Sequence, residues 1–200
     1  GTLAWVDEGG GLQIGPISAG ADPGPACYGH GGEQPTVTDA NVVLGRLNPR
    51  HLLGGKLDIH KDLAEKSIRK WICEKTKLDL VKAASRLIRI AVSEINKIMR
   101  IVSVERGIDP RLFTLIAFGG AGPMHACQLA EELSVNQVVI PINPGLFSAL
   151  GLLTADYVHN DSRAILKRVS EVEPEEVEEL FVEMEEEIGN LLLEEGVKTN

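Results

Sequence analysis

The residues best able to do chemistry in this 200-residue chain surround a glycine turn. Residues 115–123 read LIAFGGAGP, which predicts a buried strand, a turn at Gly119–Gly122 and a helix directly after it. Such a turn points backbone N–H groups and the positive end of a helix dipole into one crevice, and its glycines let a flat ring or a phosphate approach the backbone. Taken alone, the pattern fits a nucleotide site and a plain strand-to-helix connection equally well.

Two common nucleotide motifs fit this chain badly. A Walker A loop needs a hydroxyl after its lysine, but Gly54-Gly55-Lys56 is followed by Leu57. If Gly120-Ala121-Gly122 begins a GxGxxG dinucleotide-binding motif, His125 stands where the third glycine belongs. The acidic residue that would bind the ribose is also missing, because Ile142 and Asn143 lie near its expected position. NAD is therefore not expected. His125 itself could face a phosphate from the first turn of the helix, although a lone histidine is more often structural.

A second candidate is the loop Ser18–Gly29, whose sequence is SAGADPGPACYG. Prolines fix φ and glycines free it, so the composition predicts a rigid, sharply turned loop. Rigid loops on a sheet scaffold often carry catalytic groups, which makes Asp22 a candidate. A structural loop in which Asp22 caps its own backbone explains the composition better. Cys27 has no identifiable base beside it, so a thiol nucleophile has no support.

The third candidate is the stretch from Pro35 to Asn41. Asp39 and Asn41 at a strand-to-helix junction could hold a metal–phosphate complex or position a water molecule. A helix N-cap explains Asp39 equally well.

The elements that must position these groups alternate between strand and helix. Strands are expected within 3–6, 12–14, 36–38, 112–118, 138–140 and 157–166, and helices within 40–47, 60–75, 80–102, 122–133, 146–153 and 174–192. This order predicts an α/β domain with a mixed or parallel sheet and flanking helices.

Charge and composition exclude several classes of protein. Twelve of the 29 acidic residues lie in 171–195, where no Lys or Arg occurs, and the rest of the chain shows no concentrated basic face, so no nucleic-acid partner is expected. No apolar run is long enough for a membrane span, and there is no secretion signal. Three widely spaced cysteines suggest the cytoplasm. Because the chain opens at Gly1 in strand-like sequence, we expect an excerpt from a longer polypeptide.

Several stretches together resemble the hydantoinase A family, which includes 5-oxoprolinases and a subunit of acetone carboxylase. The blocks are Ser18–Gly29, PTVTDANVVLGRL from Pro35, Val104–Gly107 with Asp109-Pro110, AFGGAGPMHA from Ala117, and PGLFSALGLLTAD from Pro144. They follow the family's order and span about residues 1–160.

The resemblance implies the second half of an actin-like, ribonuclease-H-like ATPase fold. Gly119, Gly120, Ala121 and Gly122 would then lie against the nucleoside of ATP, with Mg²⁺ at the phosphates, and Asp39 and Asp22 would be the candidates for metal, water or proton handling. The domain would cover 1–168, with a helical portion at about 58–106, and 169–200 would form an acidic helix leading to another domain. The phosphate loop of the family's first half is absent from this sequence, so this chain alone is expected to be inactive and to bind nucleotide weakly or not at all.

Three functions are consistent with the resemblance. The first is an ATP-dependent hydrolase that opens cyclic amides such as hydantoins or 5-oxoproline, with a partner subunit of the hydantoinase B type. The second is the ATP-handling subunit of an acetone-type ketone carboxylase. The third is an actin-like binding module without catalysis. A metal site is not identified from the sequence.

Overall fold

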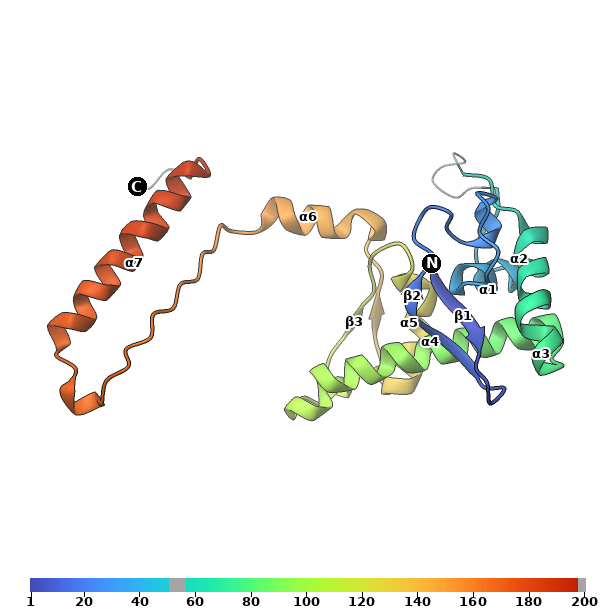
Figure 1. Ribbon diagram of the computed structural model, residues 1–200, viewed down its shortest axis with the longest axis horizontal. Coiled ribbons are helices and arrows are strands. Elements are labelled where there is room, and N and C mark those ends of the chain that lie inside the picture. Colours follow the sequence, from blue (N-terminus) through green and yellow to red (C-terminus); the bar gives the residue numbers. More distant parts are fainter. Residues whose placement is uncertain (51–56, 198–200) are drawn as a thin grey trace. The chain divides into compact units, whose positions relative to one another are not determined.

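The computed structural model describes residues 1–50 and 57–197, so Gly54–Lys56 lies outside the described residues. Internal contacts divide the chain into two units, Gly1–Phe147 and Ser148–Asn200, which are described separately (Figure 1).

The first unit opens with the expected hairpin. Strands β1 (Thr2–Val6) and β2 (Leu12–Ser18) pair antiparallel. At the tip, the Asp7 carboxylate accepts the N–H of Gly11 at 2.7 Å, and Gly10 takes a positive φ of 82°. The aspartate and glycines of the sequence thus fix the turn, and β2 continues four residues beyond the predicted end at Ile14.

The predicted strand at Thr36–Thr38 is wrong, because the helix starts there instead. Helix α1 spans Val37–Val43 with Thr36 as its N-cap, and the predicted helix at 40–47 therefore begins and ends too late. Only a single bridge between Leu3 and Thr36 has strand character. The side chains of Thr36 and Asp39 form a reciprocal capping box, which satisfies two backbone N–H groups at the helix start.

Two predicted helices are confirmed and build the core of the unit. The first consists of α2 (Lys61–Ile68), a π-helical turn η3 (Arg69–Cys73) and α3 (Glu74–Thr76), and the second is α4 (Leu80–Val102). Asp79 caps α4 by accepting the N–H of Lys82 at 2.9 Å. The apolar residues that recur at three- and four-residue steps from Leu80 to Val102 predict one buried face. Of that stripe, Ala84, Leu87, Ile88 and Ala91 are buried, whereas Ile98 and Val102 near the end of the helix are exposed. Together with Ala83 and Val92, the buried part packs against Ile68, Ile72, Ala40, Ala4 and Leu129.

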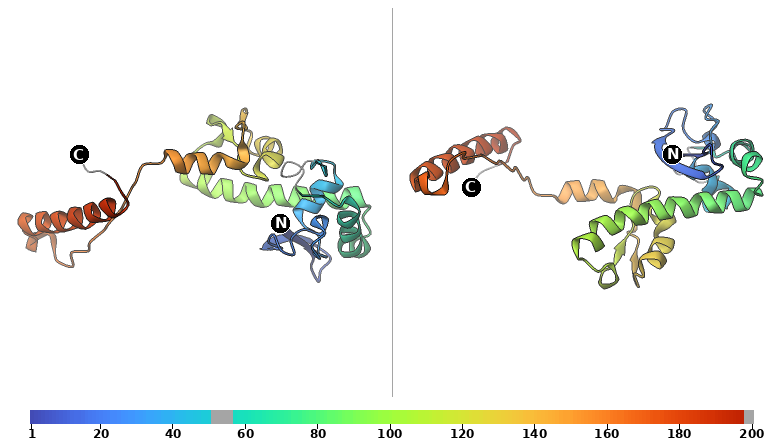
Figure 2. Two further views of the ribbon diagram at one scale, coloured as in Figure 1. Left: turned by 90° about the horizontal axis from the view of Figure 1, so that it is seen from above. Right: turned by 60° about the horizontal axis from the view of Figure 1, so that its bottom comes forward.

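The glycine turn lies within a β–α–β unit. Strand β3 (Leu115–Ile116) runs parallel to β4 (Val138–Val139), and α5 (Gly122–Leu133) connects them. The strands are shorter than predicted, partly because Pro110–Leu112 forms a 3-10 turn. Helix α4 packs against both β2 and α5 (Figures 1 and 2). The class is therefore mixed α/β, but the described residues contain two separate two-stranded sheets in place of one.

The second unit contains most of α6 (Phe147–Thr154), which starts on the last residue of the first unit, and α7 (Pro174–Glu194). Both helices confirm the sequence prediction, with Pro174 in the first turn of α7. The predicted strand at 157–166 is wrong. This segment pairs with no strand among the described residues. It is joined to α7 and its end by side chains: His159 with Glu195 at 2.9 Å, Lys167 with Glu176 at 2.6 Å, and Arg163 with Glu187.

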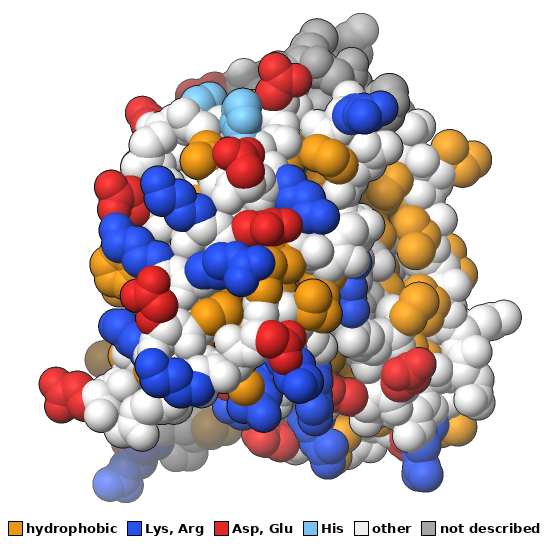
Figure 3. All heavy atoms as spheres, turned by 90° about the vertical axis from the view of Figure 1, so that its right-hand side faces the viewer, with side chains coloured by type: hydrophobic (Ala, Val, Ile, Leu, Met, Phe, Trp, Pro, Cys, Tyr) orange, Lys and Arg blue, Asp and Glu red, His pale blue; other side chains and the backbone are white. Residues whose placement is uncertain are grey.

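The face that carries α2 and α3 interleaves Lys and Arg with acidic side chains (Figure 3). Glu65 lies within 4 Å of both Lys61 and Arg69, and Lys70 pairs with Glu33 at 3.3 Å. This mixture gives no continuous basic surface on the face shown. None of the helices in the described parts of the chain is long and apolar enough to cross a membrane.

Truncation of the buried stripe on α4 tests this core. Leu87 is fully buried, so Leu87→Ala is expected to lower the free energy of unfolding by about 3 kcal/mol in urea denaturation. Ile98 on the same helix is 61% exposed, and Ile98→Ala is the matched control, with a much smaller change. Equal losses for the two variants would contradict the assignment of the buried face.

Candidate functional site

The Asp39 carboxylate is a buried junction between the proline-rich loop and α1. One oxygen accepts the N–H of Cys27 at 2.8 Å, and the other accepts the N–H and the hydroxyl of Thr36 at 2.8 and 2.7 Å. Asp39 is fully buried. These contacts match the N-cap interpretation of Asp39. A catalytic role would require one oxygen to leave its donors, and that role stays a prediction.

The proline-rich loop is as tightly turned as its composition predicts. Gly24 takes a φ of 71°, and a Cβ there would lie 2.7 Å from the carbonyl oxygen of Ala21. Asp22 is exposed on the loop and is not among the residues that line the cavity between α1 and α5. The structure therefore does not bring Asp22 and Asp39 together at one surface.

The thiol of Cys27 is not set up as a nucleophile. It is fully buried, and burial, with a further contribution from Asp39, raises the pKa of Cys27 far above its ordinary value. A thiolate is the reactive form, so this cysteine is inert in the folded chain. Its backbone, by contrast, anchors the loop through Asp39 and through the carbonyl oxygen that accepts the N–H of His60 at 2.8 Å.

The glycine turn is open. A Cβ added at Gly119 or Gly120 would meet no atom within 4 Å, and Gly119 has a φ of 84°. Among the described residues, the N–H groups of Gly120 and Ala121 find no backbone acceptor, and α5 starts with neither a side-chain cap nor an acidic residue in its first turn. The turn thus presents bare backbone and the positive end of a helix.

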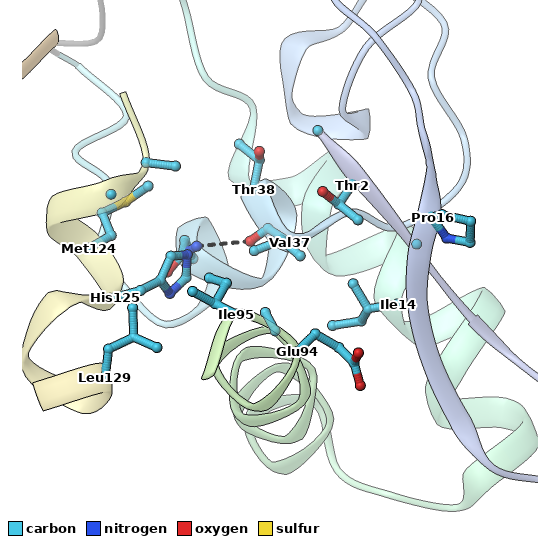
Figure 4. A pocket seen from close by; sticks show the side chains of 16 residues that line it. Thr2, Ile14, Pro16, Val37, Thr38, Glu94, Ile95, Met124, His125 and Leu129 are labelled. Carbon is cyan, nitrogen blue, oxygen red and sulfur yellow. Dashed lines mark hydrogen bonds between the residues drawn. The ribbon is translucent and has the colours of Figure 1, made fainter. Parts of the chain in front are cut away.

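A half-open cavity of about 660 Å³ lies between this turn and α1. Its walls come from the hairpin, α1, α4 and α5 (Figure 4). The turn contributes Ala121 and Gly122, and α1 contributes Val37, Thr38 and Asn41. The glycine turn and the Pro35–Asn41 motif therefore meet at one cavity. The Asp39 side chain does not line it and instead bonds to Cys27 and Thr36.

The cavity wall is mostly apolar, with few polar groups. Ile14 and Pro16 of the hairpin and Ile95 of α4 were not expected at a site, because nothing in their local sequence marks them. His125 is 4% exposed and points from α5 toward α1 (Figure 4). Burial, and then the nearby charge of Arg46, lowers the pKa of His125, so its ring is neutral at pH 7. His125 therefore lines the cavity. The sequence suggested either a phosphate-facing or a structural histidine, and neither interpretation placed it at a cavity.

The described residues do not fit a metal centre. They contain no cluster of three His, Cys, Asp or Glu side chains able to hold an ion. Magnesium can also be held by one or two carboxylates together with substrate phosphates. Of the two candidates, Asp39 has both oxygens occupied, and Asp22 lies outside the cavity lining.

With this geometry established, comparison with known proteins identifies the family. The sequence profile of the hydantoinase/oxoprolinase family matches residues 1–161. The chain belongs to this family, which confirms the resemblance.

Individual relatives agree with this assignment. An uncharacterised protein of Methanocaldococcus jannaschii is 53% identical over 198 residues, which cover 99% of this chain and 28% of the relative. The crystal structure of the ATP-dependent caprolactamase of Pseudomonas jessenii matches with a TM-score of 0.71 and 45% identity, over 76% of this chain and 22% of that one. The nucleotide-free structure of an acetone carboxylase matches with a TM-score of 0.73 and 30% identity, over 78% and 22%. The chain thus spans about a quarter of the length of these relatives.

Removal of the buried carboxylate should destabilise the domain. Asp39→Ala deletes the helix cap and the bond to the Cys27 N–H, so we expect the free energy of unfolding to fall by about 3 kcal/mol. Asp22→Ala in the same loop is the control and should change stability by less than about 0.5 kcal/mol, because Asp22 is exposed. Chemical denaturation measures both, and an unchanged Asp39→Ala protein would refute the structural role.

The lowered pKa of His125 makes stability depend on pH. Below about pH 6.5 the unfolded chain binds a proton that the folded chain resists, so stability is kept above this pH and falls as the pH drops toward the pKa of the folded state. His125→Phe should flatten this part of the profile, whereas His30→Phe, at an exposed position, should leave it intact. Urea titrations between pH 5 and pH 8 measure the effect, and an unaltered slope in His125→Phe would contradict it.

Proposed function

We propose that this chain forms the nucleotide-binding part of an enzyme that uses ATP to open cyclic amides. The supporting observation is the open turn at Gly119–Gly122, on the rim of a cavity shared with Thr38 and Asn41. The family and the likeness to an ATP-dependent caprolactamase are consistent with this role.

The turn suits the nucleoside of ATP. Gly119 and Gly120 leave space that any side chain would fill, and Gly120 and Ala121 offer N–H groups without backbone acceptors among the described residues. A nucleobase or ribose can therefore lie directly on the backbone, with Gly119, Gly120, Ala121 and Gly122 as the contact surface. The uncapped end of α5 adds a favourable field for the phosphates.

The cavity suits the second reactant. In the proposed reaction, ATP would phosphorylate the amide oxygen, so that a water molecule can add to the amide carbon. The ring C–N bond would then break to release the amine, and hydrolysis of the resulting acyl phosphate by a second water molecule would release phosphate. The contribution of this chain is to hold a ring against apolar walls near the turn, which favours reaction through proximity. Asp39 would act indirectly by fixing the wall of α1, and Asp22 remains a candidate for proton handling from the loop.

The finer description of the fold is also a proposal. We propose that the hairpin, the long helix and the parallel β–α–β unit correspond to the second half of an actin-like, ribonuclease-H-like ATPase. In that arrangement the two small sheets would belong to one sheet, residues 1–168 would form the half-domain, and 169–200 would lead to another domain. Magnesium would be held largely by the phosphates of ATP and by side chains from other parts of the full-length protein.

Assembly with another subunit is part of the same proposal. The caprolactamase of Pseudomonas jessenii and the acetone carboxylase of Xanthobacter autotrophicus are named by subunit, and a partner of the hydantoinase B type would suit this chain. Its three free cysteines suit a reducing compartment such as the cytoplasm.

A ketone carboxylase is the second candidate, because the acetone carboxylase structure shares this part of the fold. In that case ATP would activate bicarbonate and an enolisable ketone. Turnover of ATP with 5-oxoproline, hydantoin or caprolactam, against turnover with ketones plus bicarbonate, separates the two candidates in the full-length protein.

A substitution in the open glycine turn tests the proposed nucleotide-binding site. Gly120→Val places atoms where the chain has empty space, so we expect the fold to be unaffected and the Kd for ATP to rise at least about tenfold through steric exclusion. Gly189→Ala on α7 also enters open space and is the control. Calorimetry on the full-length protein measures both, and unchanged affinity in Gly120→Val would place the nucleotide elsewhere.

A further inference from the structure

Two buried polar atoms on the cavity wall have no hydrogen-bond partner. They are Oδ1 of Asn41, a residue that is fully buried, and Nδ1 of His125, a residue that is 4% exposed. Both residues line the cavity beside the glycine turn. Buried polar groups in folded proteins are nearly always paired, so an unpaired set at a cavity indicates that a ligand completes it.

The chemistry of each atom can be assigned. The Nδ2 group of Asn41 donates to the carbonyl oxygen of Val37 at 3.0 Å, drawn as the dashed line in Figure 4, so Oδ1 is left as an acceptor. The ring of His125 is neutral at pH 7, and a neutral imidazole can carry its proton on either nitrogen. Nδ1 can therefore donate to a carbonyl oxygen. Together the two residues offer one acceptor and one donor.

Most of the remaining wall is apolar, with Thr2, Thr38 and Glu94 as its other polar side chains, so it suits a compact, mainly apolar ligand. Ile14, Val37, Ile95, Met124 and Leu129 surround the two polar groups, and the volume of about 660 Å³ accommodates a small ring with room to spare. A cyclic amide presents one N–H donor and one carbonyl acceptor on such a body. A ketone of the same size has no N–H, and it would leave Oδ1 of Asn41 unpaired.

We infer that Asn41 and His125 determine specificity for the ring of the substrate, with Asn41 Oδ1 accepting the N–H of a cyclic amide and His125 Nδ1 donating to its carbonyl oxygen. This inference rests on the proposed function, in which the nucleoside occupies the exposed glycines and leaves the cavity to the second reactant. It also favours the amide-opening role over the ketone carboxylase, because only the amide satisfies both atoms.

The direct test compares three ring compounds of one size in the full-length protein. Caprolactam carries the N–H and the carbonyl, N-methylcaprolactam lacks the N–H, and cycloheptanone has only the carbonyl. Calorimetry or ligand-observed NMR should show caprolactam binding about tenfold to a hundredfold more tightly than the other two, because both lack the donor to Asn41. Equal affinity for the three compounds would overturn the inference without any substitution.

Substitution of Asn41 tests whether this side chain causes the preference for the ligand that carries the N–H group. Asn41→Leu should reduce the preference for the N–H compound to about twofold or less. The matched control is Asn96→Leu, since Asn96 also has an unpaired buried Oδ1 but does not line the cavity, and it should keep the full preference. If Asn41→Leu does not fold, His125→Gln and the comparison of N–H with N-methyl ligands still decide the question, because His125→Gln should weaken the binding of caprolactam and cycloheptanone alike.

Failure of this inference can be told from failure of the proposed function. ATP-dependent opening of lactams that is indifferent to N-methylation would overturn the role of Asn41 and leave the function standing. Preference for the N–H compound without any ATP-dependent opening would support the recognition pair and reject the function. Loss of ATP binding in Asn41→Leu, with lactam binding unchanged, would assign the cavity to the nucleobase and overturn the inference.

Discussion

The arrangement of the site depends on one buried carboxylate. Asp39 makes three hydrogen bonds, to the backbone of Cys27 and to both the backbone and the hydroxyl of Thr36. An ionised carboxylate without partners would be very costly to bury, so these donors must stay where they are. The loop before the helix and the first turn of α1 are thereby locked together, and Thr38 and Asn41 are held on the cavity wall as a consequence.

The glycine turn before α5 and the cavity beside it suit ligands of different chemistry. The turn before α5 provides backbone without side chains and an uncapped helix end, which suit a flat, anionic ligand. The cavity beside it provides apolar walls and few polar atoms, which suit a smaller and less charged ligand. Under the proposed function, one unit would hold ATP and the second reactant side by side, as phosphoryl transfer requires.

Local sequence predicted much of this structure because its signals are local. Helix α4 follows from its repeating apolar stripe, and the turn before α5 follows from three glycines after a buried run. The strand expected at Thr36–Thr38 failed because a capping box with Asp39 outweighs the β propensity of two threonines and a valine. The strand expected at 157–166 failed because a strand needs a partner, and ion pairs to α7 and its end hold that segment instead.

The site itself was predictable only in part. Gly119–Gly122 and Asn41 stand in recognisable motifs, but Ile14, Ile95 and Pro16 reach the cavity through packing of elements far apart in sequence. The burial of Asp39 likewise depends on a contact with Cys27 across twelve residues, so no periodicity or composition could separate its structural role from a catalytic one.

A crystal structure of the full-length protein with a non-hydrolysable ATP analogue tests the central claim most directly. We expect the nucleoside to lie in van der Waals contact, about 4 Å, with the backbone of Gly119–Ala121 while Asp39 keeps its bonds to Cys27 and Thr36. A nucleoside bound elsewhere, with this turn untouched, would contradict the account.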